Sequence, residues 1–209
     1  MSLETDFAMT RESLKGVQDE STYGGITSFM RRRYTRDLTG VDVAVLGVPF
    51  DLATTNRSGT RLGPRGIRTA SASLAWENQV QGWDFSPLEE LAIVDYGDCP
   101  FDAGTPEKVP EQIYQQAKAI LATDTALLSM GGDHFVSYPL LRAHAEKYGP
   151  LALIHFDAHS DTWEDDGERI DHGTMFYHAT KQGLVVPEHS AQIGLRTYNE
   201  STMGFNIFD

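Results

Sequence analysis

The sequence predicts an α/β fold built on a mainly parallel sheet. Short apolar runs rich in β-branched residues recur along the chain, and strands buried on both faces of a parallel sheet have this composition. Stretches with apolar residues at helical spacing separate the runs, and such alternation is typical of parallel sheets with right-handed crossovers. With 209 residues, the chain is long enough for one sizeable core.

The apolar runs and the helical stretches predict the order of the elements. Strands are expected at 41–48, 91–96, 126–130, 151–156 and 191–195. Helices are expected between them, at 64–76, 107–122, 138–147 and 174–181. Residues 1–40 are polar and weakly periodic, so we expect an N-terminal arm with one short helix, interrupted at Gly24-Gly25. The predicted domain covers residues 41–209.

The charge of the chain limits its partners. The formal net charge is −13, which argues against nucleic acid because phosphates need a basic surface. An acidic field attracts a small cationic substrate, although acidity also simply keeps a protein in solution. The basic cluster Arg31-Arg32-Arg33 is expected at the surface or in a subunit contact.

Several features of the sequence bear on its compartment. No apolar run approaches the about 18 residues that cross a bilayer, so no membrane partner is expected. The first residues lack a basic segment followed by an apolar one, so no secretory signal is visible. Cys99 is the only cysteine, which excludes an intrachain disulfide. These observations predict a cytoplasmic protein.

Candidate ligands follow the predicted strands, at the edge where parallel sheets bind ligands. Gly131-Gly132 permits a sharp turn and brings His134 to the carboxyl end of a strand. A lone histidine in a loop is usually structural, so His134 by itself predicts little. Asp133 is expected to orient its neighbour rather than to bind an ion.

A denser group follows the next predicted strand, where Asp157, His159 and Asp161 alternate with small residues. An extended backbone, or a loop curled around an ion, would turn the three side chains to one side. Two carboxylates so close would repel each other without a cation. Carboxylate and imidazole donors suit Mn²⁺, Fe²⁺, Co²⁺ or a catalytic Zn²⁺, and a carboxylate can bridge two ions. A helix N-terminus with acidic first-turn residues would not explain the histidine.

Two further histidines lie near these groups in the sequence. His155 precedes Asp157 by two residues, so it is expected in the core or against the ligands, with the core favoured. His172 stands just before a predicted helix, with Gly173 giving clearance. A histidine beside an activated water can carry protons, while a surface histidine next to Asp171 is an equally good interpretation.

Three strings in this order resemble the ureohydrolase (arginase/agmatinase) family. They are Gly131-Gly132-Asp133-His134, Asp157-Ala158-His159-Ser160-Asp161 and His172-Gly173-Thr174-Met175-Phe176. The strings 47–51 and 61–68 are similar to the family's N-terminal elements, and the resemblance covers about residues 41–200. Phe135 and the Asp-His-Gly-Thr-Met-Phe string look like agmatinases rather than arginases.

The resemblance implies a three-layer α/β/α fold, two Mn²⁺ ions and hydrolysis of a guanidino compound by a metal-bridging hydroxide. Agmatine, which would give putrescine and urea, is the favoured substrate. By motif position, His134 and Asp161 would bind one manganese, His159 would bind the other, and Asp157 would bridge both. His172 matches the position given a proton-transfer role. The family commonly forms trimers or hexamers, which implies a homo-oligomer.

The family also has a later Asp-x-Asp-x-x-Asp-Pro motif, whose first two aspartates complete both metal spheres, and a downstream glutamate that contacts the guanidinium. This chain contains neither. The ureohydrolase domain is therefore expected to be incomplete at its C-terminus, as a truncated product or as a naturally short protein, with truncation favoured.

Other functions stay open at this point. Guanidinobutyrase, guanidinopropionase and proclavaminate amidinohydrolase would share the metal ligands and differ in the loops that bind the far end of the substrate. The loop 163–170 carries four acidic residues: Glu164, Asp165, Asp166 and Glu168. Its acidity suits a second amine and favours agmatine, although a solvated loop explains it equally well. A non-catalytic binding module and a metal deacetylase of similar fold are alternatives from other classes.

Overall fold

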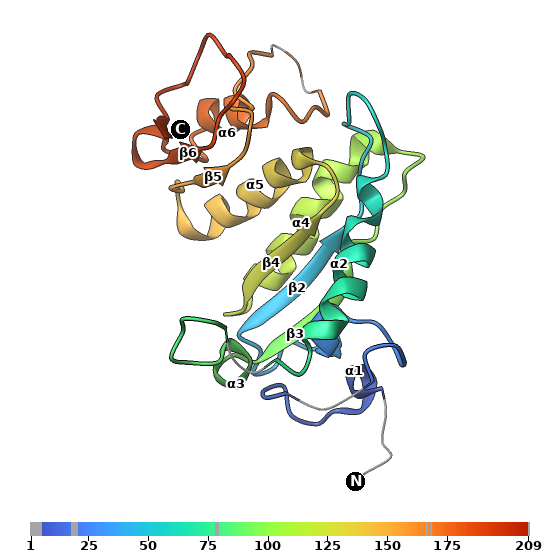
Figure 1. Ribbon diagram of the computed structural model, residues 1–209. Coiled ribbons are helices and arrows are strands. Elements are labelled where there is room, and N and C mark those ends of the chain that lie inside the picture. Colours follow the sequence, from blue (N-terminus) through green and yellow to red (C-terminus); the bar gives the residue numbers. More distant parts are fainter. Residues whose placement is uncertain (1–5, 18–20, 78–79, 166, 168, 209) are drawn as a thin grey trace. The chain divides into compact units, whose positions relative to one another are not determined.

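A computed structural model describes residues 6–17, 21–77, 80–165, 167 and 169–208 (Figure 1). The chain divides into two compact units, and each is described by itself. Unit 1 takes the described residues within Met1–Pro49, Gly59–Cys99 and Ile120–Gly132. Unit 2 takes those within Phe50–Ser58, Pro100–Ala119 and Asp133–Asp209. The boundary at residue 41 between an arm and a domain stays a prediction.

Unit 1 is built on a four-stranded sheet in the order β1-β3-β2-β4, in which every neighbouring pair is parallel. The strands are β1 (Arg33–Tyr34), β2 (Val43–Val48), β3 (Ile93–Asp98) and β4 (Ala126–Gly131). Strand β2 has a partner on each edge, and its residues from Ala44 to Val48 are buried. This burial on both faces accounts for the unbroken apolar run in the sequence.

Short helices complete unit 1. They are α1 (Phe7–Thr10), η1 (Phe29–Arg31), η2 (Thr60–Leu62), α2 (Gly63–Ser71), η3 (Ala72–Leu74) and α3 (Pro87–Glu90). Helix α2 runs alongside the sheet and begins close to the end of β4 (Figure 1). A Cβ atom at Gly63 would lie 2.6 Å from the carbonyl oxygen of Gly131, so only glycine permits this approach. The core includes Val45, Leu88, Ile93 and Met130.

Unit 2 contains a second parallel sheet in the order β5-β6-β7. Its strands are β5 (Ile154–Phe156), β6 (Ala191–Ile193) and β7 (Asn206–Phe208). Its helices are η4 (Pro106–Lys108), α4 (Val109–Leu121, the last two residues of which fall in unit 1), η5 (His134–Val136), α5 (Ser137–Tyr148), α6 (Met175–Lys181) and η6 (Pro187–His189). Helices α5 and α6 pack together, and Met175, Phe176, Ala179, Val185 and Phe205 form a buried core.

The predicted α/β fold with parallel strands is confirmed, although the described strands fall into two sheets. All the predicted strands and helices are present with shifted ends. The helix expected over 64–76 ends at Ser71 and continues as the 3₁₀ turn η3. Of the run 151–156, only Ile154–Phe156 is a strand, while Leu151 forms an isolated bridge with Val185. No helix among the described residues is both long and apolar enough to cross a membrane.

The expectation for the basic cluster 31–33 is wrong for two of its three arginines. Arg31 and Arg32 are buried, and Arg33 is exposed. The Arg32 guanidinium donates to the carbonyl oxygens of Gly16 and Met30 at 2.7 and 3.1 Å. Burial lowers the pKa of Arg32 to about 10. These arginines therefore tie loops of unit 1 together through backbone carbonyls instead of facing a partner.

Candidate metal centre

Asp133 sets the conformation of the segment that carries His134. One carboxylate oxygen of Asp133 accepts from the Phe135 backbone N–H at 3.0 Å, and the other accepts from the Ala53 N–H at 2.9 Å. The Asp133 N–H donates to the carbonyl oxygen of Phe50 at 2.7 Å. Burial raises the pKa of the Asp133 carboxyl. Both oxygens of Asp133 are engaged by backbone N–H groups, which is consistent with an orienting residue, and that role stays a prediction.

The segment after β5 curls instead of continuing as a strand. Oδ1 of Asp157 accepts from the His159 backbone N–H at 2.8 Å, which closes a tight Asx-type turn. Asp161 has φ +51°, a left-handed conformation that aspartate tolerates better than most residues. Of the two geometries expected for this segment, the curled loop is the one the structure contains.

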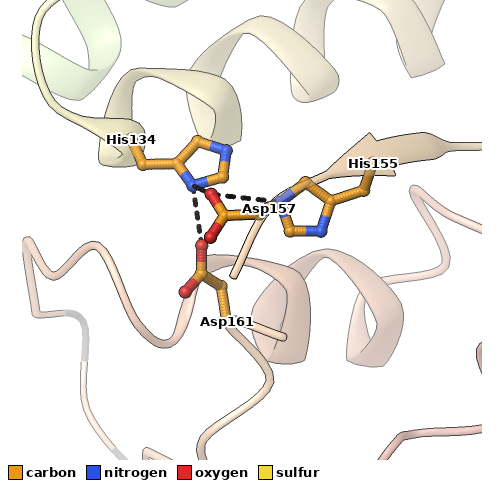
Figure 2. Close-up of side chains that lie close together, drawn as sticks. All are labelled: His134, His155, Asp157 and Asp161. Carbon is orange, nitrogen blue, oxygen red and sulfur yellow. Dashed lines mark ion pairs between the residues drawn. The ribbon is translucent and has the colours of Figure 1, made fainter. Parts of the chain in front are cut away.

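Four side chains of unit 2 form a compact group: His134, His155, Asp157 and Asp161 (Figure 2). Each offers one nitrogen or oxygen atom, and these atoms lie within 4.8 Å of one another. Nδ1 of His134 lies 2.7 Å from Oδ2 of Asp161 and 3.4 Å from Oδ2 of Asp157. The structure thus brings together three of the four predicted ligands, and His155 completes the group.

The fourth predicted ligand, His159, lies on the other side of the Asp157 carboxylate. Its Nδ1 is 3.2 Å from Oδ1 of Asp157, and its side chain is 52% exposed. The two oxygens of Asp157 therefore face two different imidazoles, with His134 near Oδ2 and His159 near Oδ1. This is the arrangement expected of a carboxylate placed between two cation positions.

The four predicted ligands and His172 all line one cavity of about 640 Å³. A cavity of this size suits a small ligand. Gly173 follows His172 against the wall of the cavity, where an added Cβ would lie 3.0 Å from the Trp163 ring. The space left by the missing side chain at Gly173 is therefore occupied by the Trp163 indole.

The two described carboxylates of the acidic loop 163–170 have different surroundings. Glu164 lines the cavity, and its Oε1 accepts from the Tyr177 hydroxyl at 3.2 Å. Oδ2 of Asp165 instead lies 3.4 Å from Nε2 of His178. Asp166 and Glu168 lie outside the described residues. Glu164 is therefore the described acidic residue of this loop that a ligand in the cavity would meet.

The charges of the cavity favour cations. The described residues of its wall include four acidic residues, Asp157, Asp161, Glu164 and Asp171, and one arginine, Arg169. Burial alone would raise the pKa of the Asp157 carboxyl, but the His159 N–H and the neighbouring imidazoles outweigh it and lower that pKa. Asp157 is thus kept as a carboxylate.

The residues present fit a divalent cation. The carboxylates of Asp157 and Asp161 converge on the same imidazole nitrogen of His134. Two carboxylates held this close repel each other unless positive charge lies between them. Mixed oxygen and nitrogen donors without thiolate suit Mn²⁺ and its neighbours among the first-row ions.

Sequence reasoning missed two residues that support the centre. Phe176 packs edge-on against the rings of both His134 and His155, at centroid distances of 5.6 and 4.7 Å. Gln192 is fully buried on β6 and hydrogen-bonds to His155. A glutamine in the middle of an apolar strand is the signal that could have pointed to Gln192, because a buried amide needs partners.

The fold and this donor set define an α/β protein with a carboxylate–imidazole cluster that could hold a metal ion. The chain belongs to the arginase family, whose sequence model matches residues 41–209. This confirms the resemblance drawn from the three strings.

Named relatives show where in the family the similarity is high. An agmatinase of Chromobacterium violaceum is 56% identical over 204 residues, which cover 97% of this chain and 63% of the relative. A solved hypothetical agmatinase from Burkholderia thailandensis aligns with TM-score 0.95 and 54% identity, over 99% of this chain and 65% of that one. The solved proclavaminate amidino hydrolase from Streptomyces clavuligerus aligns with TM-score 0.81 and 33% identity, over 90% of this chain and 64% of that one. The arginase-like fold is confirmed, and the chain spans about two thirds of the length of these relatives.

Proposed function

We propose that this protein catalyses the manganese-dependent hydrolysis of a guanidino compound. The proposed substrate is agmatine, which is converted to putrescine and urea. The observation that carries the proposal is the position of Asp157, whose two carboxylate oxygens face two different imidazoles. The names of the relatives support the substrate, because agmatinases are 44–56% identical to this chain.

The geometry of unit 2 supports a division of the proposed metal ligands between two cations. His134 and Asp161 would hold one cation, His159 would hold the other, and Asp157 would contact both. Bound divalent cations lower the pKa of water and so supply a nucleophile near neutral pH. Manganese is proposed because carboxylate, imidazole and water ligands suit it.

The remaining groups of the cavity would act on the substrate. The carboxylates of Glu164 and Asp171 attract and orient a guanidinium, which is a planar cation with several N–H donors. During hydrolysis a C–N bond of the guanidinium breaks, the oxygen of water ends in urea, and the departing amine gains a proton. His172 lines the same cavity, and its imidazole can hold that proton and pass it to the amine.

Other ureohydrolases are the second candidate. The similarity to proclavaminate amidino hydrolase over 90% of this chain favours a shared centre with a different substrate. The acidic lining distinguishes the candidates, because it suits a second amine better than the carboxylate of a guanidino acid. The cytoplasmic location and the trimeric or hexameric assembly stay predictions.

Urea release tests the proposal. The purified protein is loaded with Mn²⁺ and offered agmatine, 4-guanidinobutyrate, 3-guanidinopropionate and arginine in parallel. We expect urea and putrescine from agmatine at the highest kcat/KM, and no urea after the metal is removed with a chelator. A protein that binds manganese and releases urea from none of these compounds would be a binding module, and the proposal would be wrong.

A further inference from the structure

His155 is a buried histidine whose ring is held by its neighbours. Only 5% of the side chain is exposed. The ring of Phe176 packs against it in a T-shaped contact at 4.7 Å, and the ring of His134 lies at 5.1 Å. The two ring nitrogens of His155 therefore have definite surroundings, and these decide which nitrogen carries the proton.

Gln192 determines which nitrogen of His155 carries the proton, because a backbone carbonyl fixes the orientation of the Gln192 amide. The amide nitrogen of Gln192 lies 2.7 Å from the carbonyl oxygen of Ser160 and 3.2 Å from Nδ1 of His155. A carbonyl oxygen only accepts, so the NH₂ group must face Ser160, and rotating the amide would set two acceptor oxygens against each other. The second hydrogen of the NH₂ group then points to Nδ1 of His155. That nitrogen must therefore be the unprotonated one.

Nε2 of His155 consequently carries the proton. Among the described residues this buried atom has no hydrogen-bond partner within normal length. Oδ2 of Asp157 lies 3.6 Å from it, just beyond that length, and Figure 2 shows the ring turned toward this carboxylate. A metal ion binds a nitrogen lone pair, which Nε2 in this tautomer does not offer.

We propose that His155 is a positioning residue, held by Gln192 as the Nε2–H tautomer and orienting the Asp157 carboxylate without binding an ion. The inference rests on the proposed function only in taking Asp157 as a metal ligand. It divides the four neighbouring donors into three ligands and one orienting residue. A buried N–H group 3.6 Å from the Asp157 carboxylate attracts that carboxylate electrostatically and limits the directions it can take, and loss of a residue that orients a metal ligand weakens metal binding.

Long-range ¹H–¹⁵N NMR of the histidine side chains tests the tautomer directly. The whole protein is studied alone and with Zn²⁺ as a diamagnetic probe, and the spectrum of the His155→Gln variant identifies the signals of His155. We expect the Nε2–H pattern for His155 in both states, while the signals of His134 shift on zinc binding. An Nδ1–H pattern for His155, or loss of its Nε2 proton when zinc binds, would overturn the proposal.

A pair of glutamine variants tests the positioning role. Gln192→Met keeps the length of the side chain and removes the donor, whereas Gln182→Met alters an exposed glutamine that hydrogen-bonds to Tyr138. Zn²⁺ affinity is expected to fall about tenfold or more in Gln192→Met, as for other partners of metal ligands, and to stay unchanged in Gln182→Met. An affinity of Gln192→Met within twofold of the parent would overturn the role.

The two experiments distinguish failure of this inference from failure of the proposed function. If Gln192→Met does not fold, the tautomer of the parent protein still decides the assignment. A parent protein that shows the Nε2–H pattern but releases no urea would reject the proposed function and leave this inference standing.

Discussion

His134 and Asp161 approach to 2.7 Å between Nδ1 and Oδ2, although they come from separate segments of the chain. Two features hold Asp161 in place. Its backbone is in the left-handed region, and its carbonyl oxygen accepts from the Phe176 N–H at 3.0 Å. The contact joins the segment after β4 to the loop after β5, and it forms one side of the candidate metal centre.

Removing the charge of Asp161 should weaken the binding of the cation next to His134. Asp161→Asn keeps the size of the side chain and its tolerance of positive φ, so the fold is expected to survive. Loss of a residue that only hydrogen-bonds to a metal ligand lowers metal affinity about 10- to 100-fold. Because Asp161 is proposed to bind the ion itself, manganese affinity measured by calorimetry should fall by more than this.

The matched control for this variant is Asp171→Asn. Asp171 lines the same cavity outside the four-residue group, and its Oδ1 accepts from the Gly173 N–H, which an asparagine can replace. Its manganese affinity should match that of the parent. Equal affinities for Asp161→Asn and the parent would remove Asp161 from the ligand set.

His172 should affect the reaction without affecting metal binding. His172→Asn is expected to lower kcat for urea release about 100-fold or more, the usual contribution of a positioned proton carrier. Manganese affinity should stay the same, because no predicted ligand is changed. His189→Asn, at an exposed histidine of η6, is the control. A His172→Asn variant with parental kcat would show that this histidine carries no proton in the reaction.

The ion pair of Arg68 with Asp95 should be important for the stability of unit 1. Nε and Nη2 of Arg68 donate to the two oxygens of Asp95 at 2.7 and 2.9 Å, and the Asp95 side chain is fully buried. Burial alone would lower the pKa of Arg68, but hydrogen bonds to Asp95 and Asp98 outweigh it and raise that pKa. Asp95→Ala is expected to lower the free energy of unfolding by about 3 kcal/mol, the lower end of the range for a broken buried pair, since Arg68 keeps only the half-exposed carboxylate of Asp98 at 2.6 Å.

Chemical denaturation measures this change. Lys118→Ala is the comparison, because its partner Glu146 lies at 2.7 Å in an exposed pair and such pairs contribute little. Similar denaturation midpoints for Asp95→Ala and Lys118→Ala would contradict the structural role given to the buried pair.

Cys99 should react slowly and with a strong dependence on pH. Burial raises the pKa of its thiol to about 12, because the thiolate is disfavoured away from water. At pH 8 the thiolate fraction is then about 10⁻⁴, so alkylation by iodoacetamide should be far slower than for free cysteine and should accelerate as pH rises. Fast alkylation of the native protein at pH 8 would contradict this environment, while the protein in denaturant should react quickly.

The sequence predicted most of the fold because buried parallel strands leave unbroken apolar runs. Val43–Val48 was found on this basis. Ala126–Gly131 was found from a similar apolar run, although it is an edge strand of its sheet and only partly buried. The short strands β1 and β7 were missed, since Arg33–Tyr34 and Asn206–Phe208 are exposed and too short to show a pattern. The burial of Arg32 was also missed, because backbone carbonyls satisfy its charge and carbonyls leave no trace in a sequence.

Part of the candidate site was visible in the sequence and part was not. The spacing of Asp157 and Asp161 indicated a shared ion, and the structure places both beside His134. Spacing could not show that the loop curls. The curled loop places His159 near Oδ1 of Asp157 and His155 near Oδ2. The contact of Gln192 with His155 joins β6 to β5, and only the fold determines such a pairing.

Anomalous X-ray diffraction at the manganese edge, on crystals of the protein soaked in Mn²⁺, tests the central claim most directly. We expect two anomalous peaks flanking the carboxylate of Asp157, one next to His134 and Asp161 and the other next to His159. Crystals saturated with Mn²⁺ that show no anomalous peak within bonding distance of Asp157 would contradict it.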